Sequence, residues 1–209
     1  KSGTLFKVNG ADTNFRFDTS SSRVDPSLTI ALDPVDDVHL YAKWGTAYRA
    51  GGANSRSVSY RAFGPEEVQT TEAGMKADSW NQRARLNVAA YSTRYTDIQI
   101  DFSAVNLNAS NRGTLETVNA PGTGKIRGFE ADLALAPTDG LRLSLSYAYT
   151  DGKLPQAANP FNNNALQNVF VVYTPKNAFG GSIDFERPLS WAKLHANFNG
   201  SVADGYRAS

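Results

Sequence analysis

Apolar and polar residues alternate along most of the chain, which is the two-residue period of a β-strand with one apolar face. The clearest case is GFEADLALAPTDGLRLSLSYAYTDG, residues 128–152, where two alternating runs flank the turn sequence PTDG. One side of these runs carries Phe129 and Leu133, and the other carries Glu130 and Arg142. The pattern predicts an antiparallel hairpin with an apolar side and a polar side.

Similar alternating runs recur from one end of the chain to the other, and no stretch shows the periodicity of an amphipathic helix. We expect about nine or ten strands, the clearest at residues 12–18, 27–33, 37–49, 66–79, 82–100, 127–136, 141–150, 178–186 and 194–203. The fold class is therefore all-β.

The links between these runs alternate in length. Residues 33–37, 79–82, 137–140 and 187–190 are short and turn-like. Residues 50–65, 101–123 and 152–172 are long, polar and rich in Gly, Asn, Ser and Pro. This alternation is typical of an antiparallel up-and-down barrel with tight turns at one rim and loops at the other.

The apolar sides could face a soluble core or lipid. Runs of about 10 residues, such as 127–136 and 141–150, suit a tilted membrane-spanning strand better than the shorter strands of soluble proteins. Trp80 and Trp191 lie near the short turns, and tyrosines lie near the long links, which resembles two interfacial girdles. We favour a transmembrane β-barrel over a soluble β-sandwich.

Composition narrows the chemistry. The 209 residues include no cysteine and carry a formal net charge of +1, which excludes a disulfide framework and gives no reason to expect nucleic-acid binding. No 18-residue apolar stretch predicts a transmembrane helix. His39 and His195 are the only histidines, and no arrangement around them predicts a metal site or a catalytic centre. We expect neither an enzyme nor a cofactor.

Four stretches resemble the barrel of TonB-dependent outer-membrane receptors. They are DDVHLYAKWGTAYRAGGAN (residues 36–54), FGPEEVQTTEAGMKAD (63–78), RLNVAAYSTRYTDIQI (85–100) and NAPGTGKIRGFEADLALAPTDGLRLSLSYAYTDG (119–152). They occur in the order of the family's C-terminal half. The resemblance implies that residues 1–209 are part of one 22-stranded barrel domain, without the family's N-terminal plug and terminal strands.

The same resemblance implies a function. Such a receptor sits in the bacterial outer membrane, in contact with its lipid, and binds a scarce small-molecule or metal-chelate ligand, most commonly a siderophore–iron complex. Import uses energy delivered by the TonB complex, which contacts the N-terminal part that this chain lacks. Two alternatives stay open: a passive porin-like outer-membrane channel and a soluble carbohydrate-binding β-sandwich.

Ligand contacts are expected in the long links and at the adjacent lumen ends of strands. An arginine there can hold an anionic group, and an aromatic ring can stack on a ligand. The candidates are Tyr48, Arg49, Asn54, Arg112, Phe161 and Asn163.

Overall fold

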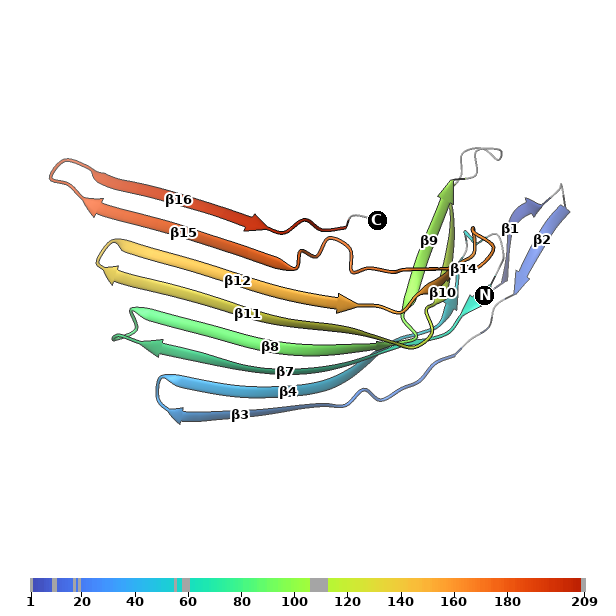
Figure 1. The fold of residues 1–209 in the computed structure, drawn as a ribbon, viewed down its shortest axis with the longest axis horizontal. Helices are drawn as coiled ribbons and strands as arrows, with labels where there is room; N and C mark the ends of the chain where they lie inside the picture. The colour runs from blue at the N-terminus through green and yellow to red at the C-terminus, as the bar shows by residue number, and fades with distance from the viewer. Residues whose placement is uncertain are drawn as a thin grey trace.

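One antiparallel sheet of eight long strands dominates the computed structural model, which describes residues 2–8, 11–16, 18, 20–54, 56–57, 61–105 and 113–207 (Figure 1). The strands are β3 (Ser27–Val35), β4 (Val38–Arg49), β7 (Glu66–Ser79), β8 (Ala84–Thr96), β11 (Thr123–Thr138), β12 (Leu141–Lys153), β15 (Asn177–Pro188) and β16 (Lys193–Ala203). Each pairs with its neighbours in chain order, so the sheet is an up-and-down meander that confirms the predicted fold class. Within the described residues, no helix is long and apolar enough to cross a membrane.

The short links join the wall strands at one end of the sheet, as predicted. In the β7–β8 turn, Trp80, Asn81 and Gln82 all adopt left-handed backbone conformations, with φ between 53° and 63°. The β11–β12 turn uses Gly140 at φ 80°, and a Cβ there would clash with the backbone carbonyl of Glu186. Glycine is the residue that meets both requirements.

Shorter strands form four separate hairpins. These are β1 (Ser2–Val8) with β2 (Ala11–Arg16), β5 (Gly52–Ala53) with β6 (Ala62–Phe63), β9 (Gln99–Val105) with β10 (Gly113–Asn119), and β13 (Ala157–Asn159) with β14 (Ala165–Gln167). The run predicted at 12–18 thus contributes to a hairpin outside the wall. The run predicted at 82–100 divides at Asp97, whose φ of 53° redirects the chain from β8 into β9.

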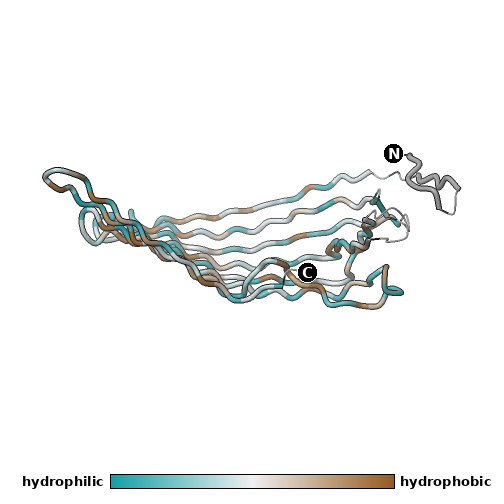
Figure 2. Tube along the Cα trace, turned by 90° about the horizontal axis from the view of Figure 1, so that it is seen from above, coloured by the Kyte–Doolittle hydropathy of each residue, from teal (hydrophilic) through white to brown (hydrophobic). Residues whose placement is uncertain are grey.

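The register places apolar and polar residues on opposite faces of the eight-stranded sheet. Leu145 pairs with Leu133 and Gly181 on the face that we call the apolar face, and Asp132 pairs with Ser146 on the polar face. The apolar face is open: Leu145 is 57% exposed and Phe198 is 72% exposed. Figure 2 shows the strands as one curved layer, so this surface is a wall and not half of a sandwich core.

The apolar band crosses the strands obliquely. The ladder row through Phe198 of β16 continues through Ile183, Leu143 and Leu135 but ends at polar Ser79 in β7. From β16 to β3 the band therefore moves toward the loop end of the sheet, two residues at a time. In β3 it consists of Leu28, Ile30 and Leu32. Such a shift is expected where strands are tilted relative to a flat lipid layer.

Tyrosines cover glycines on the polar face. The ring of Tyr41 lies over Gly74, where an added Cβ would lie 2.6 Å from the ring. Tyr91 lies over Gly128 in the same way, and its hydroxyl is 3.3 Å from Thr150 Oγ1 on the next strand. Each glycine lets an aromatic ring pack flat across a neighbouring strand.

Placing a charge on the apolar face tests its contact with lipid. We expect Leu145→Arg in the intact barrel to lower the free energy of unfolding by about 2–4 kcal/mol, because the guanidinium would enter hydrocarbon. Ser144→Arg, on the polar face of the same strand, should cost far less. Urea unfolding in lipid vesicles measures both, and equal costs would contradict a lipid-facing Leu145.

Filling the space under a tyrosine tests the packing on the polar face. Gly128→Ala should destabilise the intact barrel by about 1–3 kcal/mol, since the new methyl group displaces the Tyr91 ring. In a Tyr91→Ala background the same change should be nearly neutral. Gly200→Ala is the control, because no heavy atom lies within 4 Å of a Cβ built there. A cost at Gly128 that persists without Tyr91 would contradict this packing.

Candidate functional site at the loop end of the sheet

The most buried residues of the described chain lie beyond the wall, in the long links and at the strand ends that meet them. They are Ser57, Glu66, Gln99, Glu116, Thr117, Ala120, Gly124 and Ala157. Strand β10 contacts both β6 and β13, which joins the three long links into one group (Figure 1). We call the hairpins β5–β6, β9–β10 and β13–β14, with their adjoining residues, the loop cluster. Its interior is largely polar.

The side-chain amide of Asn119 connects two of these links. Its Nδ2 lies 2.8 Å from the carbonyl oxygen of Asp97, 3.1 Å from that of Gly64 and 3.2 Å from that of Pro65. Its Oδ1 accepts a 2.7 Å hydrogen bond from the backbone N–H of Gly64. One amide therefore satisfies backbone groups from both the β4–β7 link and the β8–β9 corner.

Gln99 makes a second connection beside the first. Its Nε2 donates to the carbonyl oxygens of Ala50, at 3.0 Å, and Gly64, at 2.9 Å. Its backbone N–H donates to Glu66 Oε2 at 2.7 Å, so the first residue of β9 is tied to the first residue of β7. The Oε1 atom of Gln99 is buried and accepts no hydrogen bond from the described part of the chain.

Two further hydrogen bonds hold the β9–β10 hairpin and its neighbour. Ser57 Oγ donates to the buried carboxylate of Glu116 at 2.7 Å, and Thr117 Oγ1 donates to Asp101 Oδ1 at 2.6 Å. Because a hydrogen bond to a charged group is stronger than a neutral one, these contacts fix the hairpin more firmly than its backbone ladder alone.

The loop cluster has the character of a preorganised platform. Its buried carboxylates Glu66 and Glu116 already accept hydrogen bonds from protein groups. No group of three or more His, Cys, Asp or Glu side chains in the described part of the chain is placed to hold a metal ion. What the arrangement can do is present loop surfaces in a fixed geometry, which reduces the entropy lost when a ligand binds.

Tyr48 and Arg49, predicted as ligand contacts, lie at the loop end of β4 on opposite faces. Arg49 lies on the polar face, directly opposite Glu66 in the ladder. Tyr48 lies on the apolar face, where its hydroxyl donates to Ser21 Oγ at 2.7 Å and the Arg23 guanidinium lies 5.6 Å from its ring centre. Tyr48 thus holds the chain segment that precedes β3, and only Arg49 of the two points toward the lumen side.

Phe161 and Asn163 lie together in the β13–β14 turn. Phe161 is 38% exposed, and its N–H donates to Asn159 Oδ1; Asn163 adopts a φ of 48°. Asn54 lies in the separate β4–β7 link, where its Oδ1 accepts from the N–H of Arg56. Arg112 lies outside the described residues.

Gln99, Asn119 and Glu116 were not predicted as site residues from the sequence. The signal that could have indicated the two amides is their position beside links rich in Gly and Pro, as in the stretch NAPG that begins at Asn119.

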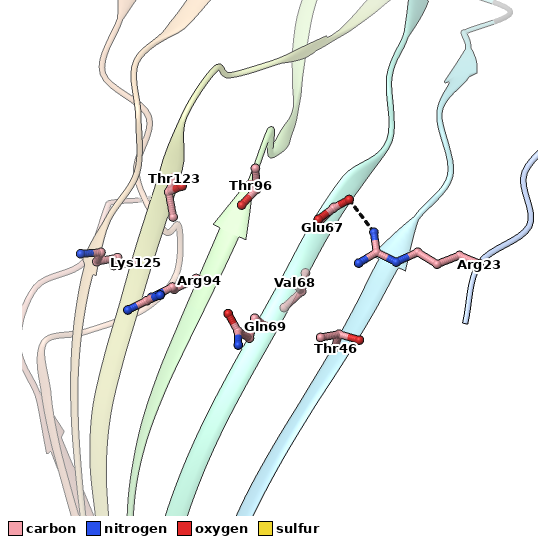
Figure 3. Close-up of a pocket in the computed structure, with 9 residues that line it drawn as sticks. All are labelled: Arg23, Thr46, Glu67, Val68, Gln69, Arg94, Thr96, Thr123 and Lys125. Atoms are coloured by element: carbon pink, nitrogen blue, oxygen red, sulfur yellow. Dashed lines mark ion pairs between the residues drawn. The ribbon is translucent and has the colours of Figure 1, made fainter. Parts of the chain in front are cut away.

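A depression of about 570 Å³ opens on the apolar face, just beyond the apolar band toward the loop end (Figure 3). It is lined by Arg23, Thr46, Glu67, Val68, Gln69, Arg94, Thr96, Thr123 and Lys125. Arg23 forms ion pairs with Asp25 and Glu67. Arg94 and Lys125 extend from the neighbouring strands β8 and β11 (Figure 3) and form no ion pair with a described residue. The depression lies on the outside of the wall, so it is not part of a pore.

Changing one amide tests the loop cluster. We expect Asn119→Asp to loosen residues 50–65, because the carboxylate cannot donate and its charge would face three carbonyl oxygens. Hydrogen exchange of residues 61–65 should rise at least ten-fold while the wall strands stay protected. Asn168→Asp is the matched control, since the structure uses the Asn168 side chain as an acceptor from Gln156. Unchanged exchange in Asn119→Asp would contradict the network.

Known proteins resemble the chain along most of its length. Its sequence is 27% identical to the metal-pseudopaline receptor CntO of Pseudomonas aeruginosa strain UCBPP-PA14 over 161 residues, which is 75% of this chain and 21% of that protein. It is also 27% identical to the probable TonB-dependent siderophore receptor PiuA of Acinetobacter baumannii over 164 residues, covering 72% of this chain and 19% of PiuA. The chain thus spans about a fifth of these relatives.

Solved structures share the fold. The ferric yersiniabactin uptake receptor FyuA from Yersinia pestis aligns with 93% of this chain and 28% of its own, at a TM-score of 0.71 and 16% identity. BauA, the ferric preacinetobactin receptor of Acinetobacter baumannii, aligns with 92% of this chain and 26% of its own, at a TM-score of 0.61 and 17% identity. The family described as TonB dependent receptor-like, beta-barrel matches residues 4–208. The chain therefore belongs to the TonB-dependent receptor family, within its β-barrel domain.

Proposed function

We propose that the whole protein is an active transport receptor of the bacterial outer membrane and that this chain supplies eight strands of its barrel wall. The observation that carries the proposal is the exposed apolar face of a single-layered sheet within this family's barrel domain. A soluble sandwich has to cover such a face with a second sheet, and the eight long strands form only one. In the closed barrel, edge strands β3 and β16 pair with further strands.

In this proposal the sheet has a defined orientation. Barrels of this class have short turns on the periplasmic side and long loops on the cell surface. The loop cluster would therefore face the medium, and the turns containing Trp80, Gly140 and Trp191 would face the periplasm. The polar face, with Glu130, Asp132 and other charged groups, lines the lumen.

We infer a metal-chelate cargo, of the siderophore type. Support comes from the relatives, whose names specify a metal–pseudopaline complex and siderophores, and from the shared fold of receptors named for ferric yersiniabactin and ferric preacinetobactin. Ferric siderophore complexes often combine anionic oxygen ligands with aromatic rings. Arg49 on the polar face and Phe161 in the β13–β14 turn supply a cation and an exposed ring at the loop end.

Energy would come from the TonB complex, acting on a part of the protein beyond this chain. A passive porin-like channel is the competing function, because it would use the same kind of wall. Family membership favours the receptor, since the family consists of TonB-dependent transporters. Family membership also means that no enzymatic role is needed to explain the loop cluster.

Uptake by the full-length receptor tests the function. We expect cells that depend on it to accumulate a radiolabelled ferric siderophore from a panel, and an uncoupler of the proton gradient to abolish accumulation. Arg49→Ala and Phe161→Ala should each weaken binding at least five-fold at unchanged receptor abundance. Ser144→Ala, in the middle of the wall, is the control. Accumulation of the ferric siderophore that is unchanged by the uncoupler would instead establish a passive channel.

A further inference from the structure

Two kinds of segment supply the side chains that cover glycines on the polar face of the wall. In the middle of the wall, Tyr41 and Tyr91 cover Gly74 and Gly128, and both rings belong to wall strands. Nearer the loop end, the covering side chains come from the β12–β15 link, residues 154–176. A link can leave such a position, whereas a strand that is bonded on both sides cannot.

The first position covered by the link is Gly124 in β11. It lies on the polar face, an even number of residues from Asp132 in the same strand. A Cβ built at Gly124 would lie 2.8 Å from Leu154 Cδ2 and 3.3 Å from Pro155 Cδ. A side chain at this position would displace the start of the link, so the glycine lets the link pack against the wall.

The second position is Gly152 in β12, on the same face as Ser146 of that strand. A Cβ built there would lie 2.7 Å from Val171 Cγ2 and 3.8 Å from Ile126 Cγ1. Val171 comes from the far end of the link, so both ends of the link rest on neighbouring wall strands. We call Gly124 and Gly152 the glycine seats. The link that they hold folds over the polar face of the wall.

The hydrogen bonds of the link stay within the link. Strand β13 pairs with β14, and the side-chain amides of Gln156 and Asn159 donate to Asn168 and Gln167. No hydrogen bond joins residues 154–172 to a described residue outside the link. The other two long links, by contrast, are bonded to each other. The β12–β15 link is thus a self-contained unit that apolar contacts hold on the wall.

The C-terminal end of the link shows where it can turn. Tyr173 adopts a φ of 55°, a left-handed conformation that is uncommon for a bulky residue. Its backbone N–H donates to the carbonyl oxygen of Arg207 at 2.9 Å, which fixes the link at this point. The Arg207 guanidinium also lies 3.6 Å from the ring centre of Phe170. Residues 154–172 can therefore turn as one body about Tyr173 and the end of β12.

We propose that the β12–β15 link is an autoinhibitory lid, which rests on the glycine seats over the mouth of the lumen and must leave them before cargo enters. This rests on the transport role and the orientation in the proposed function. In the closed state, the side chains of Leu154, Pro155 and Val171 occupy the lumen face at the loop end. Cargo and lid compete for one surface, so the apparent affinity for cargo is reduced in proportion to the open fraction of the receptor.

Locking the lid with a disulfide tests the proposal on the full-length receptor in cells. A Cβ built at Gly152 lies 3.6 Å from Val171 Cβ, a spacing that suits a disulfide, and the chain contains no cysteine of its own. Oxidised G152C/V171C should bind and accumulate roughly ten-fold less of each radiolabelled ferric siderophore that the receptor takes up from the panel. Dithiothreitol should restore both. V171C alone, treated with the same oxidant, is the control. Unchanged accumulation with the disulfide formed would overturn the lid.

Weakening the contact tests the lid in the opposite direction. V171A removes two methyl groups from the contact over Gly152, so the lid should open more often and the affinity for the same ferric siderophore should rise about five-fold. V202A is the matched control, because this valine lies on the apolar face of β16, and its affinity should not change. A link that only supports the binding surface would bind more weakly after V171A, and that result would contradict autoinhibition.

Access to the wall beneath the lid separates this proposal from the transport function, because it is measured without cargo. Ile126 and Val171 both lie within 4 Å of the Cβ position of Gly152, so I126C reports on the covered surface. A membrane-impermeant maleimide should label I126C/V171A about five-fold faster than I126C. Equal rates would overturn the lid, even in a receptor that transports. Faster labelling in a receptor that accumulates no ferric siderophore would support the lid and contradict the transport function alone.

Discussion

The pairing of backbone groups in a single layer is the constraint on which the rest of the structure depends. A sheet that contacts lipid on one face must satisfy its N–H and C=O groups within the sheet, because hydrocarbon offers no partner. The long antiparallel ladders from β3 to β16 do this, and side chains then alternate between two different surroundings. Leu145 and Ser144 are neighbours in sequence and face opposite environments for this reason alone.

Tilt follows from the same ladders. The apolar band has to stay level with the lipid, whereas the hydrogen-bonded rows run perpendicular to the strands. Since the row of Phe198 leaves the band at Ser79, the strands cannot stand upright in the membrane. Arg127 in β11 and Trp44 in β4 share one ladder row. The slope of the band explains why this row carries a cation in one strand and an apolar ring in the other.

The sequence was sufficient to predict the wall. Strand positions, turn ends and the two faces of β11 and β12 all depend on neighbouring residues, so alternation predicts them directly. It was insufficient for the break at Asp97, where a left-handed residue interrupts an otherwise continuous pattern. Likewise, Tyr48 was predicted as a ligand contact because it is an aromatic residue at the loop end of a strand. Alternation of apolar and polar residues cannot predict that its hydroxyl bonds Ser21, which lies in a distant segment of the chain.

The loop cluster was beyond sequence analysis because its bonds join residues far apart in the chain. Asn119 reaches Gly64, and Gln99 reaches Ala50, across separate links. No local periodicity specifies such contacts. Their polar character also hides them, since a buried polar interior has the same composition as an exposed loop.

The hydrogen bonds made by the side-chain amides of Asn119 and Gln99 end on backbone atoms of residues 50, 64, 65 and 97. Any amino acid that keeps the backbone path offers the same carbonyl oxygens. The side chains of this link can therefore change over evolutionary time without loss of the contacts that fix its shape. The two side-chain amides thus fix the geometry of the link independently of its side chains, so new loop surfaces can evolve on an unchanged backbone support.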